Sequence, residues 1–552
     1  MSKRGTGHRQ QTIGFGFVVA LCLVISVFPI LAPRAPTEDD PGAISVERAL
    51  EHVEFIAQEP HVMGTPEIER VREYLIETLT GVGLEPETLT VETPDYFGAP
   101  GGTVDVTDVL VRVAGSGDGE AILFMAHFDT VPSTPGANDN STAVAALLEV
   151  GRVLASEPTP PNDVILLFTD GEEPTPRFGA WGFAEYHPWF ADVALAVNLE
   201  GIGVAGPTML VEMSGPKDEL ILRLANAAPD VVAFSFMTQT ADLIGGAVSD
   251  FDVFRDAGVP GYDFTYMRGM SIYHTSRDAI DVANVNGLAH DISLSLGIAR
   301  NFGSLEIGNA TTNAVFFTAP FGFVVRYSAT GAIVSLAAAL LLLVGALWSR
   351  VRRRGTSVRK LLSGLGLVLL GALAALVVAT VVWVGLVNLR SDMGVVEGYA
   401  YLAALVGLTG RAWYLVERRS AISGSDAGGG LLITWLVLAV VAGAFLPAFG
   451  YLFVWPAIAA GIGELLTARN RGFASRLASV IVVALVTFVV LVPAVDTFFH
   501  LASPRPGNQG SDLSFTIVVP LFLSFLAVGL IAARVSEPGR LSTPTHPDVT
   551  AA

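Results

Sequence analysis

The sequence has very little cysteine and little charge for its length. Its one cysteine among 552 residues, Cys22, lies in an apolar run, so no disulfide can form within the chain. Charged residues make up 15%, whereas a soluble protein usually has about 25%. Hydrophobic residues reach 51%, and the mean hydropathy is +0.54. We therefore expect part of the chain to lie in lipid, and any domain outside the cytoplasm to depend on its core or on bound metal.

The charges divide the chain into two unlike regions. Residues 33–326 hold 43 of the 52 acidic side chains but only 14 of the 33 basic ones, a net charge of −29. The remainder of the chain carries a net charge of +10. Phosphate binding needs clustered Lys and Arg, so the acidic region argues against nucleic acid as a partner. The composition favours one region in water and another in contact with a lipid bilayer.

An uncharged run near the start, residues 12–32, is long enough to cross a membrane, since about 20 residues span the hydrocarbon. A cleaved signal peptide is the alternative. The length of the run, Pro29 within it and the poor cleavage context after it favour a retained transmembrane anchor. Basic residues before the run place residues 1–11 in the cytoplasm.

Residues 329–533 contain one apolar run after another, which predicts an all-helical membrane domain of about seven spans. The expected spans are residues 329–349, 361–388, 399–416, 431–448, 451–468, 477–495 and 513–533. If every run crosses, arginine-rich loops alternate with loops that hold at most one arginine, as the positive-inside rule requires. The chain is then expected to be a multi-pass cell-membrane protein with residues 33–328 outside the cytoplasm and residues 534–552 as a cytoplasmic tail.

Two charged residues fall inside these expected spans, Arg411 and Glu464. Snorkelling of the side chains to the interface is the simpler interpretation. A path for a substrate or an ion is the alternative.

Residues 33–328 alternate short apolar strands with helical patterns. Strands are expected at Val109–Val113, Ala121–Ala126, Val164–Thr169, Ala194–Leu199, Thr208–Met213 and Gly261–Tyr266. Helices are expected at Ser45–Gln58, Glu67–Thr80, Thr142–Ala155, Phe178–Tyr186, Lys217–Ala227 and Val285–Asn301. The alternation predicts an α/β sandwich with a central, mostly parallel twisted sheet flanked by helices. Ligands bind such sheets beyond the carboxyl ends of the strands.

Three of these strand ends carry side chains suited to a metal. His127 ends the first, and Asp129 at i+2 lies on the same side, where it can fix the tautomer of the ring. Glu172 and Glu173 follow the second as an adjacent pair, which repels unless a cation lies between them or one is protonated. One glutamate as ligand and the other as general base is a sensible division. Glu200 ends the third strand.

Two further candidates lie outside the strands. Asp139 follows a turn at a helix entry, where the helix dipole keeps a carboxylate ionised, although N-capping is the structural alternative. His274 is preceded by Tyr273. Together the two histidines and three carboxylates form the ligand set expected of zinc, with manganese or cobalt possible. Five ligands with one shared carboxylate predict a two-metal site.

In this order and spacing, the clusters resemble the M28 family of zinc peptidases, of the aminopeptidase Y and bacterial leucyl-aminopeptidase type, over roughly residues 45–305. The resemblance implies that one zinc ion takes His127, Asp139 and Glu200. A second would take Asp139, Glu173 and His274. The remaining roles it implies are general base for Glu172, orientation of His127 for Asp129, and oxyanion donor for Tyr273.

The chain departs from the family pattern at two positions. Many members have Asp where Glu200 stands, and many have Asp–Asp where this chain has Asp139–Asn140. The layout of one N-terminal span and many C-terminal spans is similar to the vacuolar membrane protease and endoplasmic reticulum metallopeptidase branch. In that branch the catalytic domain faces the lumen, which agrees with the orientation expected from charge.

The resemblance implies a membrane-bound metallopeptidase that hydrolyses peptides with a water activated by two zinc ions. An aminopeptidase that releases N-terminal residues is the leading hypothesis, since an acidic domain suits a cationic N-terminus. A carboxypeptidase or a glutaminyl cyclase of the same fold remains open. So does an inactive, peptidase-like binding or chaperone domain, or an accessory domain on a membrane transporter.

Overall fold

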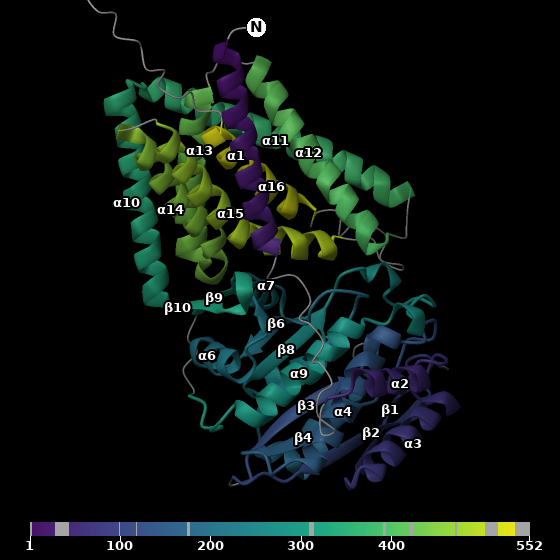
Figure 1. Cartoon of the computed structure of the whole chain (residues 1–552). Helices are drawn as coiled ribbons and strands as arrows, with labels where there is room; N and C mark the ends of the chain where they lie inside the picture. Colours follow the sequence, from purple (N-terminus) through teal and green to yellow (C-terminus); the bar gives the residue numbers. More distant parts are fainter. Residues whose placement is uncertain are drawn as a thin grey trace, which may run out of the picture.

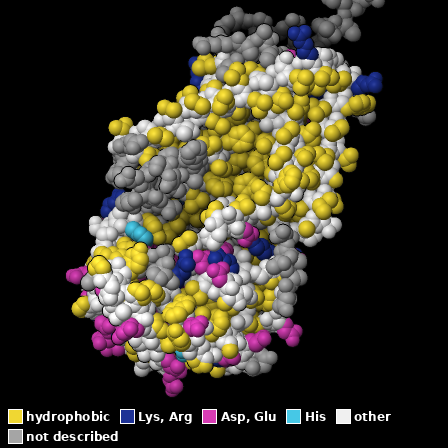
Figure 2. Space-filling view, turned by 180° about the vertical axis from the view of Figure 1, so that it is seen from behind, with side chains coloured by type: hydrophobic (Ala, Val, Ile, Leu, Met, Phe, Trp, Pro, Cys, Tyr) yellow, Lys and Arg dark blue, Asp and Glu magenta, His cyan; other side chains and the backbone are white. Residues whose placement is uncertain are grey.

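The computed structural model shows an α/β domain at one end of a bundle of long helices, with the N-terminus at the opposite end of the bundle (Figure 1). The residues that the structure describes are 3–27, 44–98, 100–117, 119–173, 177–308, 314–389, 393–419, 424–469, 472–502 and 517–535. In the space-filling view, apolar side chains cover the helical part, and acidic side chains gather on the α/β domain (Figure 2).

The α/β domain is built on an eight-stranded sheet in the order β1-β2-β4-β3-β5-β8-β6-β7. The strands are β1 Glu87–Pro94, β2 Thr103–Val113, β3 Ala121–His127, β4 Asp163–Thr169, β5 Val193–Gly201, β6 Met209–Ser214, β7 Val232–Ala233 and β8 Gly261–Tyr266. The central strands β4, β3, β5 and β8 are parallel to one another. Antiparallel pairs flank them, β1–β2 and β2–β4 on one side and β6–β8 on the other. The sheet is therefore parallel at its centre, as predicted, and mixed at its edges.

Helices cover both faces of this sheet, because the central strands are buried along their whole length. The helices are α2 Val46–Ile56, α3 Pro66–Gly81, α4 Thr142–Ser156, α5 Phe178–Tyr186, α6 Lys217–Ala227, α7 Ser235–Ile244, α8 Phe251–Asp256 and α9 Val285–Asn301. On β3, Ile122 and Phe124 face the core shared with α2, α3, α4, α6 and α9. Leu123 and Met125 point the other way, toward α5 and α8. This two-sided burial explains the unbroken apolar strands of the sequence.

A two-stranded ribbon connects the α/β domain to the helical bundle. It consists of β9 Ala314–Thr318 and β10 Val324–Ser328, paired antiparallel. Phe317 on β9 stacks on Tyr451 of the bundle, with ring centroids 5.0 Å apart. Tyr327 on β10 accepts a hydrogen bond from the Trp455 indole at 3.0 Å. The ribbon was not predicted from the sequence.

The bundle consists of long helices that overlap the expected spans, although their ends differ from the predicted ones by up to nine residues. They are α1 Lys3–Val27, α10 Ala329–Arg354, α11 Val358–Leu389, α12 Val395–Arg419, α13 Gly424–Phe445, α14 Pro447–Arg469, α15 Phe473–Leu501 and α16 Val518–Val535. Within the described residues, all of these except α1 and α12 are long and apolar enough to cross a membrane. The apolar part of α1, Ile13–Val27, is shorter. Residues 28–32 and 513–516 of the expected first and last spans lie outside the described part.

The two charged residues expected inside spans have different surroundings. The Arg411 guanidinium lies over the Tyr414 ring of the same helix, 5.4 Å from its centroid. Glu464 is fully buried, and its Oε2 accepts hydrogen bonds from Arg350 at 2.7 Å and Arg534 at 2.6 Å. Glu464 therefore does not snorkel, because it joins α14 to α10 and α16.

Candidate metal centre

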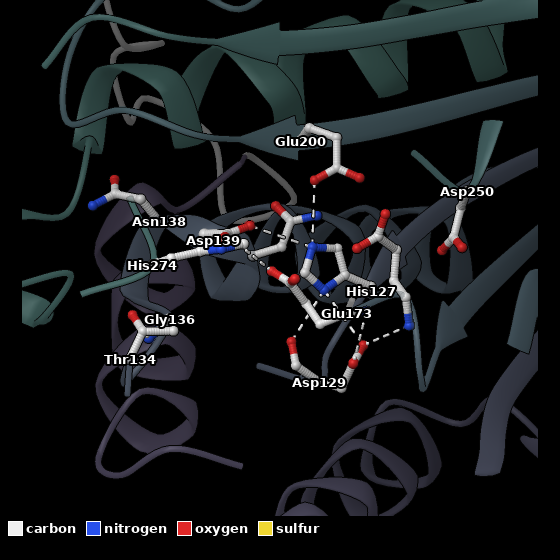
Figure 3. Close-up of polar contacts among 12 residues, drawn as sticks. His127, Asp129, Thr134, Gly136, Asn138, Asp139, Glu173, Glu200, Asp250 and His274 are labelled. Atoms are coloured by element: carbon white, nitrogen blue, oxygen red, sulfur yellow. Dashed lines mark hydrogen bonds and ion pairs between the residues drawn. The ribbon is translucent and has the colours of Figure 1, made fainter. Parts of the chain in front are cut away.

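The five candidate ligands meet at the carboxyl edge of the parallel strands (Figure 3). His127 is the last residue of β3, and Glu200 lies one residue before the end of β5. The turn after β4 carries the glutamate pair. Asp139 belongs to the short segment η2 Ala137–Ser141 that leads into α4, and His274 follows the short helix η4 Met270–Ile272. Residues distant in the sequence meet here because parallel strands end on the same side.

The first group of possible ligands joins His127, Asp139 and Glu200. The His127 Nε2 atom lies 3.4 Å from Asp139 Oδ1 and 3.4 Å from Glu200 Oε2. All three side chains are buried or nearly so. An imidazole nitrogen and two carboxylate oxygens facing one point are a plausible set for zinc.

The second group joins Asp139, Glu173 and His274. His274 Nε2 lies 2.7 Å from Glu173 Oε1 and 3.3 Å from Asp139 Oδ2. Asp139 thus presents a different oxygen to each group. Among the described residues its Oδ2 accepts no well-formed hydrogen bond. A buried carboxylate oxygen normally has a partner, and a metal ion would supply one.

Glu172 faces the same space. It forms a third possible ligand group with His127 and Glu173, and it is buried like its neighbour. The geometry alone therefore permits Glu172 to be a ligand or a base.

The candidate ligands are more acidic than basic, since Asp139, Glu172, Glu173 and Glu200 face only the two imidazoles of His127 and His274. Burial and repulsion from Asp139 raise the pKa of Glu173 to about 7. Burial, with the nearby carboxylates, also raises the pKa of Glu172 well above its usual value. Although burial lowers the pKa of an imidazole, Asp139 and Glu173 raise the pKa of His274 to about 10. Two ligand groups that share Asp139, one oxygen of which has no well-formed hydrogen bond, fit a dimetal site.

Asp129 does more than the sequence predicted. Its carboxylate accepts the backbone N–H groups of Glu172 at 3.1 Å and Glu173 at 3.0 Å. The His127 Nδ1 atom lies 3.1 Å from the Asp129 carbonyl oxygen and 3.5 Å from its Oδ1. One aspartate therefore fixes both the imidazole ring and the turn with the glutamate pair.

Asp278 holds the shared carboxylate, a role that sequence reasoning missed. Its Oδ2 accepts the backbone N–H of Asp139 at 3.0 Å, and its Oδ1 accepts the backbone N–H of Asn138 at 2.9 Å. Burial and repulsion from Asp139 raise the pKa of Asp278 to about 6. Its only signal in the sequence was a position four residues after His274.

Asn140 is one of the two departures from the family pattern, and a hydrogen bond explains why an asparagine suits this position. Its side-chain amide donates to the Leu199 carbonyl at 2.8 Å. An aspartate could not donate this hydrogen bond. The amide ties the segment with Asp139 to the strand end with Glu200, and so links two ligands of the first group.

The site opens into a pocket of about 400 Å³. Besides the possible ligands, Tyr273 lines it, with its ring stacked on His274 at a centroid distance of 3.8 Å. The opposite wall is mainly apolar and includes Ile202, Val211 and Val248. Asp263 lies at the base, bonded to Asn198 and Ser249. The pocket can receive a small side chain next to the metal ligands.

Part of the chain is similar to known proteins. Residues 108–297 match the model of Peptidase family M28. Human Endoplasmic reticulum metallopeptidase 1 is 27% identical over 410 residues, which cover 68% of this chain and 45% of that protein. The Vacuolar membrane protease of Candida dubliniensis is 30% identical over 267 residues, covering 46% and 28%. The chain spans less than half the length of these curated relatives.

Solved structures are matched over about half of this chain. An aminopeptidase from Aneurinibacillus sp. strain AM-1 has 15% identity and a TM-score of 0.39, covering 48% of this chain and 97% of that one. A glutaminyl cyclase from Porphyromonas gingivalis has 18% identity and a TM-score of 0.37, covering 46% and 96%.

The fold and the ligand cluster define an α/β domain with a candidate dimetal site, joined to a domain of long apolar helices. The chain contains a peptidase M28 domain and is a multi-pass membrane protein related to the endoplasmic reticulum metallopeptidases and vacuolar membrane proteases.

Proposed function

We propose that this protein is an aminopeptidase that uses two zinc ions. The observation that carries the proposal is the pair of ligand groups that share Asp139, with Glu172 beside them and in neither group. His127 and Glu200 complete the first group, Glu173 and His274 the second. When bound, two such ions would lower the pKa of a water and polarise the scissile carbonyl.

Glu172 is the general base in this proposal. Its carboxylate is buried beside both ligand groups, where it can take a proton from a water held between them. It accepts the proton of the attacking water and returns it to the leaving amine. The Tyr273 hydroxyl, at the rim of the same pocket, donates to the oxyanion that forms at the carbonyl.

The pocket supports a peptide with a free N-terminus as the substrate. The carboxylates that surround it favour a cationic α-amine, and the apolar wall of Ile202, Val211 and Val248 suits an aliphatic side chain. Relatives named as a metallopeptidase and a protease also favour peptide substrates.

An assay of the full-length protein with zinc tests this function. Aminoacyl reporters should be cleaved, and N-blocked and carboxypeptidase reporters should not. Cleavage of only the carboxypeptidase reporter, or cyclisation of an N-terminal glutamine, would assign the other activities considered from the sequence. No turnover of any reporter in the zinc-loaded protein would favour a peptidase-like binding domain instead.

We also propose that the peptidase domain lies outside the cytoplasm. The charge pattern supports this orientation, since Arg352, Arg353 and the other basic residues that join α10 to α11 lie at the far end of the bundle from the peptidase domain. Cysteines introduced at Ser133 and Ser357 in a Cys22→Ser background test it. An impermeant maleimide should label position 133 in intact cells and not position 357. The reverse pattern would overturn the orientation.

A further inference from the structure

The segment that carries Tyr273 and His274 rests on the membrane domain. We call residues 267–278 the junction loop. The Arg268 guanidinium contacts Asp496 of α15, with Nε and Nη2 at 3.2 and 3.0 Å from Oδ2. Three residues later, the Ser271 hydroxyl donates to the Met393 carbonyl at 3.1 Å. The loop thus meets the bundle at two points shortly before the metal ligand.

Asp496 is itself held in place by the membrane domain. The Tyr399 hydroxyl of α12 donates to its Oδ1 at 2.7 Å. His500, one turn further along α15, lies 3.6 Å from the same oxygen. The Asp496 side chain is 6% exposed. A buried and bonded carboxylate is a fixed anchor, whereas an exposed ion pair would contribute little.

The junction loop has almost no space to move between the two domains. Gly269 has φ +78°, in the left-handed region, and a Cβ there would lie 2.5 Å from Val204 and 3.0 Å from Val395 of α12. Beyond this point, Arg277 donates to the Ser271 carbonyl and closes the loop on itself. The loop is therefore pressed against α12 and folded so that Tyr273 and His274 face the pocket.

A second wall of the pocket also starts from the membrane domain. Ser235, the first residue of α7, donates to the Ala448 carbonyl at 2.7 Å. Gln239, one turn on, accepts the backbone N–H of Phe449 at 2.8 Å. The chain that leaves α7 continues to Val248, in the apolar wall. Two separate walls of the pocket therefore depend on contacts with the helices.

We propose that the membrane domain completes the catalytic site, and that Asp496 is a positioning residue that holds Tyr273 and His274 through Arg268. The proposal rests on the proposed peptidase function. It gives the helical bundle a role in catalysis beyond anchoring. A displacement of about 1 Å at a reacting group can cost on the order of 100-fold in rate, so a distant anchor can matter this much.

The test compares Asp496→Asn with Asp496→Glu in the full-length protein. Asp496→Asn should lower kcat by about 10–100-fold with little change in KM, because it loosens groups that act in the transition state. Asp496→Glu should restore part of the loss. Arg411→Gln, which removes a charge from α12 at a residue that stacks on Tyr414, is the matched control and should behave as wild type.

Hydrogen exchange gives a readout that is independent of peptidase activity. Amides of the junction loop should exchange faster in Asp496→Asn, whereas β8 just before it should not change. Wild-type exchange and kcat in Asp496→Asn would overturn the proposal. If that variant fails to fold, Tyr399→Phe keeps the Arg268 pair but removes one bond to Asp496, and unchanged loop exchange there would overturn it equally. If the wild type has no peptidase activity but Asp496→Asn still speeds amide exchange in the junction loop, the proposed function is wrong and the anchoring role of Asp496 stands.

A cavity in the membrane domain carries a second inference. It measures about 720 Å³ and lies between α1, α12, α15 and α16. Its polar members Arg268, Tyr399 and Asp496 lie at the end toward the peptidase domain. From Asp496 the lining continues along α15 to Phe488, eight residues or about 12 Å of helix. Apart from Ser524 the rest of the lining is apolar.

We infer that this cavity binds one acyl chain of a lipid from the leaflet on the peptidase side. The gradient from polar end to apolar depth matches a lipid whose head lies near the interface. Arg268 and Asp496 compensate each other, so the polar end offers hydrogen bonds without net charge. The cavity is therefore expected to bind the acyl chain and to show the same affinity for lipids with neutral and with negatively charged head groups.

Photolabelling in bilayer nanodiscs tests this inference. Phosphatidylcholine with a photoactivatable group at mid-chain should label the cavity faces of α12 and α15. Ala403→Trp should reduce that labelling several-fold by filling the cavity, whereas Leu341→Trp on the exposed face of α10 should not. Phosphatidylglycerol should label equally. If labelling is uniform along the helices and unchanged in Ala403→Trp, the inference is wrong. It is also wrong if an acylated peptide displaces the label and added lipid does not.

Discussion

Two buried charge clusters, one in each domain, are built in opposite ways. In the peptidase domain, four carboxylates share two imidazoles, Asp139 being the acid common to both ligand groups. In the membrane domain, one carboxylate, Glu464, lies between two guanidiniums. The first cluster has more carboxylates than imidazoles, so a bound cation would balance its charge. The carboxylate of the second cluster is already balanced by its two arginines.

The difference separates a functional cluster from a structural one. Carboxylates and imidazoles whose oxygen and nitrogen atoms converge on shared points are suited to bind metal. The carboxylate of Glu464 is paired with two arginines and joins helices α10, α14 and α16. Both types look alike in sequence, as acidic residues in apolar surroundings. Variants in the first cluster should therefore lose activity, whereas variants in the second should lose stability.

The largest effect is expected from removing Asp139. Asp139→Ala deletes an oxygen from both ligand groups, so bound zinc should fall from two equivalents toward none, and activity should fall to that of the chelator-treated wild type. Metal analysis and kcat/KM measure both. The matched control is Asp281→Ala, a nearby acid that belongs to neither ligand group. Two zinc ions in Asp139→Ala would rule it out as the shared ligand.

The next effect separates the adjacent glutamates. Glu172→Gln should keep two zinc ions and lose about 10²–10⁴-fold in kcat, the usual contribution of a general base. Glu173→Gln should bind the second zinc ion more weakly and recover part of its activity when zinc is added. Zinc content and kcat of both variants decide the roles. If Glu172→Gln loses metal and Glu173→Gln keeps both ions while inactive, the two roles are reversed.

A purely structural loss is expected at Glu464. Glu464→Ala leaves two buried arginines without their shared partner and should cost about 3–5 kcal/mol of stability. Thermal unfolding in detergent measures this change. The kcat of the protein that remains folded should match wild type, since the cluster lies at the far end of the bundle. A normal melting temperature with a low kcat would show that Glu464 acts in catalysis and not in stability, and the two clusters would then not differ as described.

The last effect depends on pH and comes from a buried acid in α9. Burial raises the pKa of Asp291 to about 8, and Thr208 donates to it. The folded state therefore holds a proton that the unfolded chain releases near pH 4. Stability should fall as pH rises from about 4 to 8. Asp291→Asn should remove this slope, so its melting temperature should exceed that of wild type by more at pH 8 than at pH 6.

Most of the fold was predictable because burial on both faces leaves a clear pattern. The apolar runs predicted the central strands β3, β4, β5 and β8 close to their observed ends. β1 and the ribbon β9–β10 were missed, since β1 is half-exposed and the ribbon is a separate two-stranded sheet that packs against the bundle. Exposed or interdomain strands lack the continuous apolar signal of a buried strand.

The sequence by itself indicated the long apolar helices, the sheet type and the residues able to hold metal, because each depends on local composition or on side chains at strand ends. Only the tertiary structure decided that Asp139 presents one oxygen to each ligand group and that Asp278 and Asp129 fix the surrounding backbone. The contact between Arg268 and Asp496 also emerged only there. These facts depend on which oxygen or nitrogen faces which neighbour across long sequence separations, and residue spacing carries no record of that.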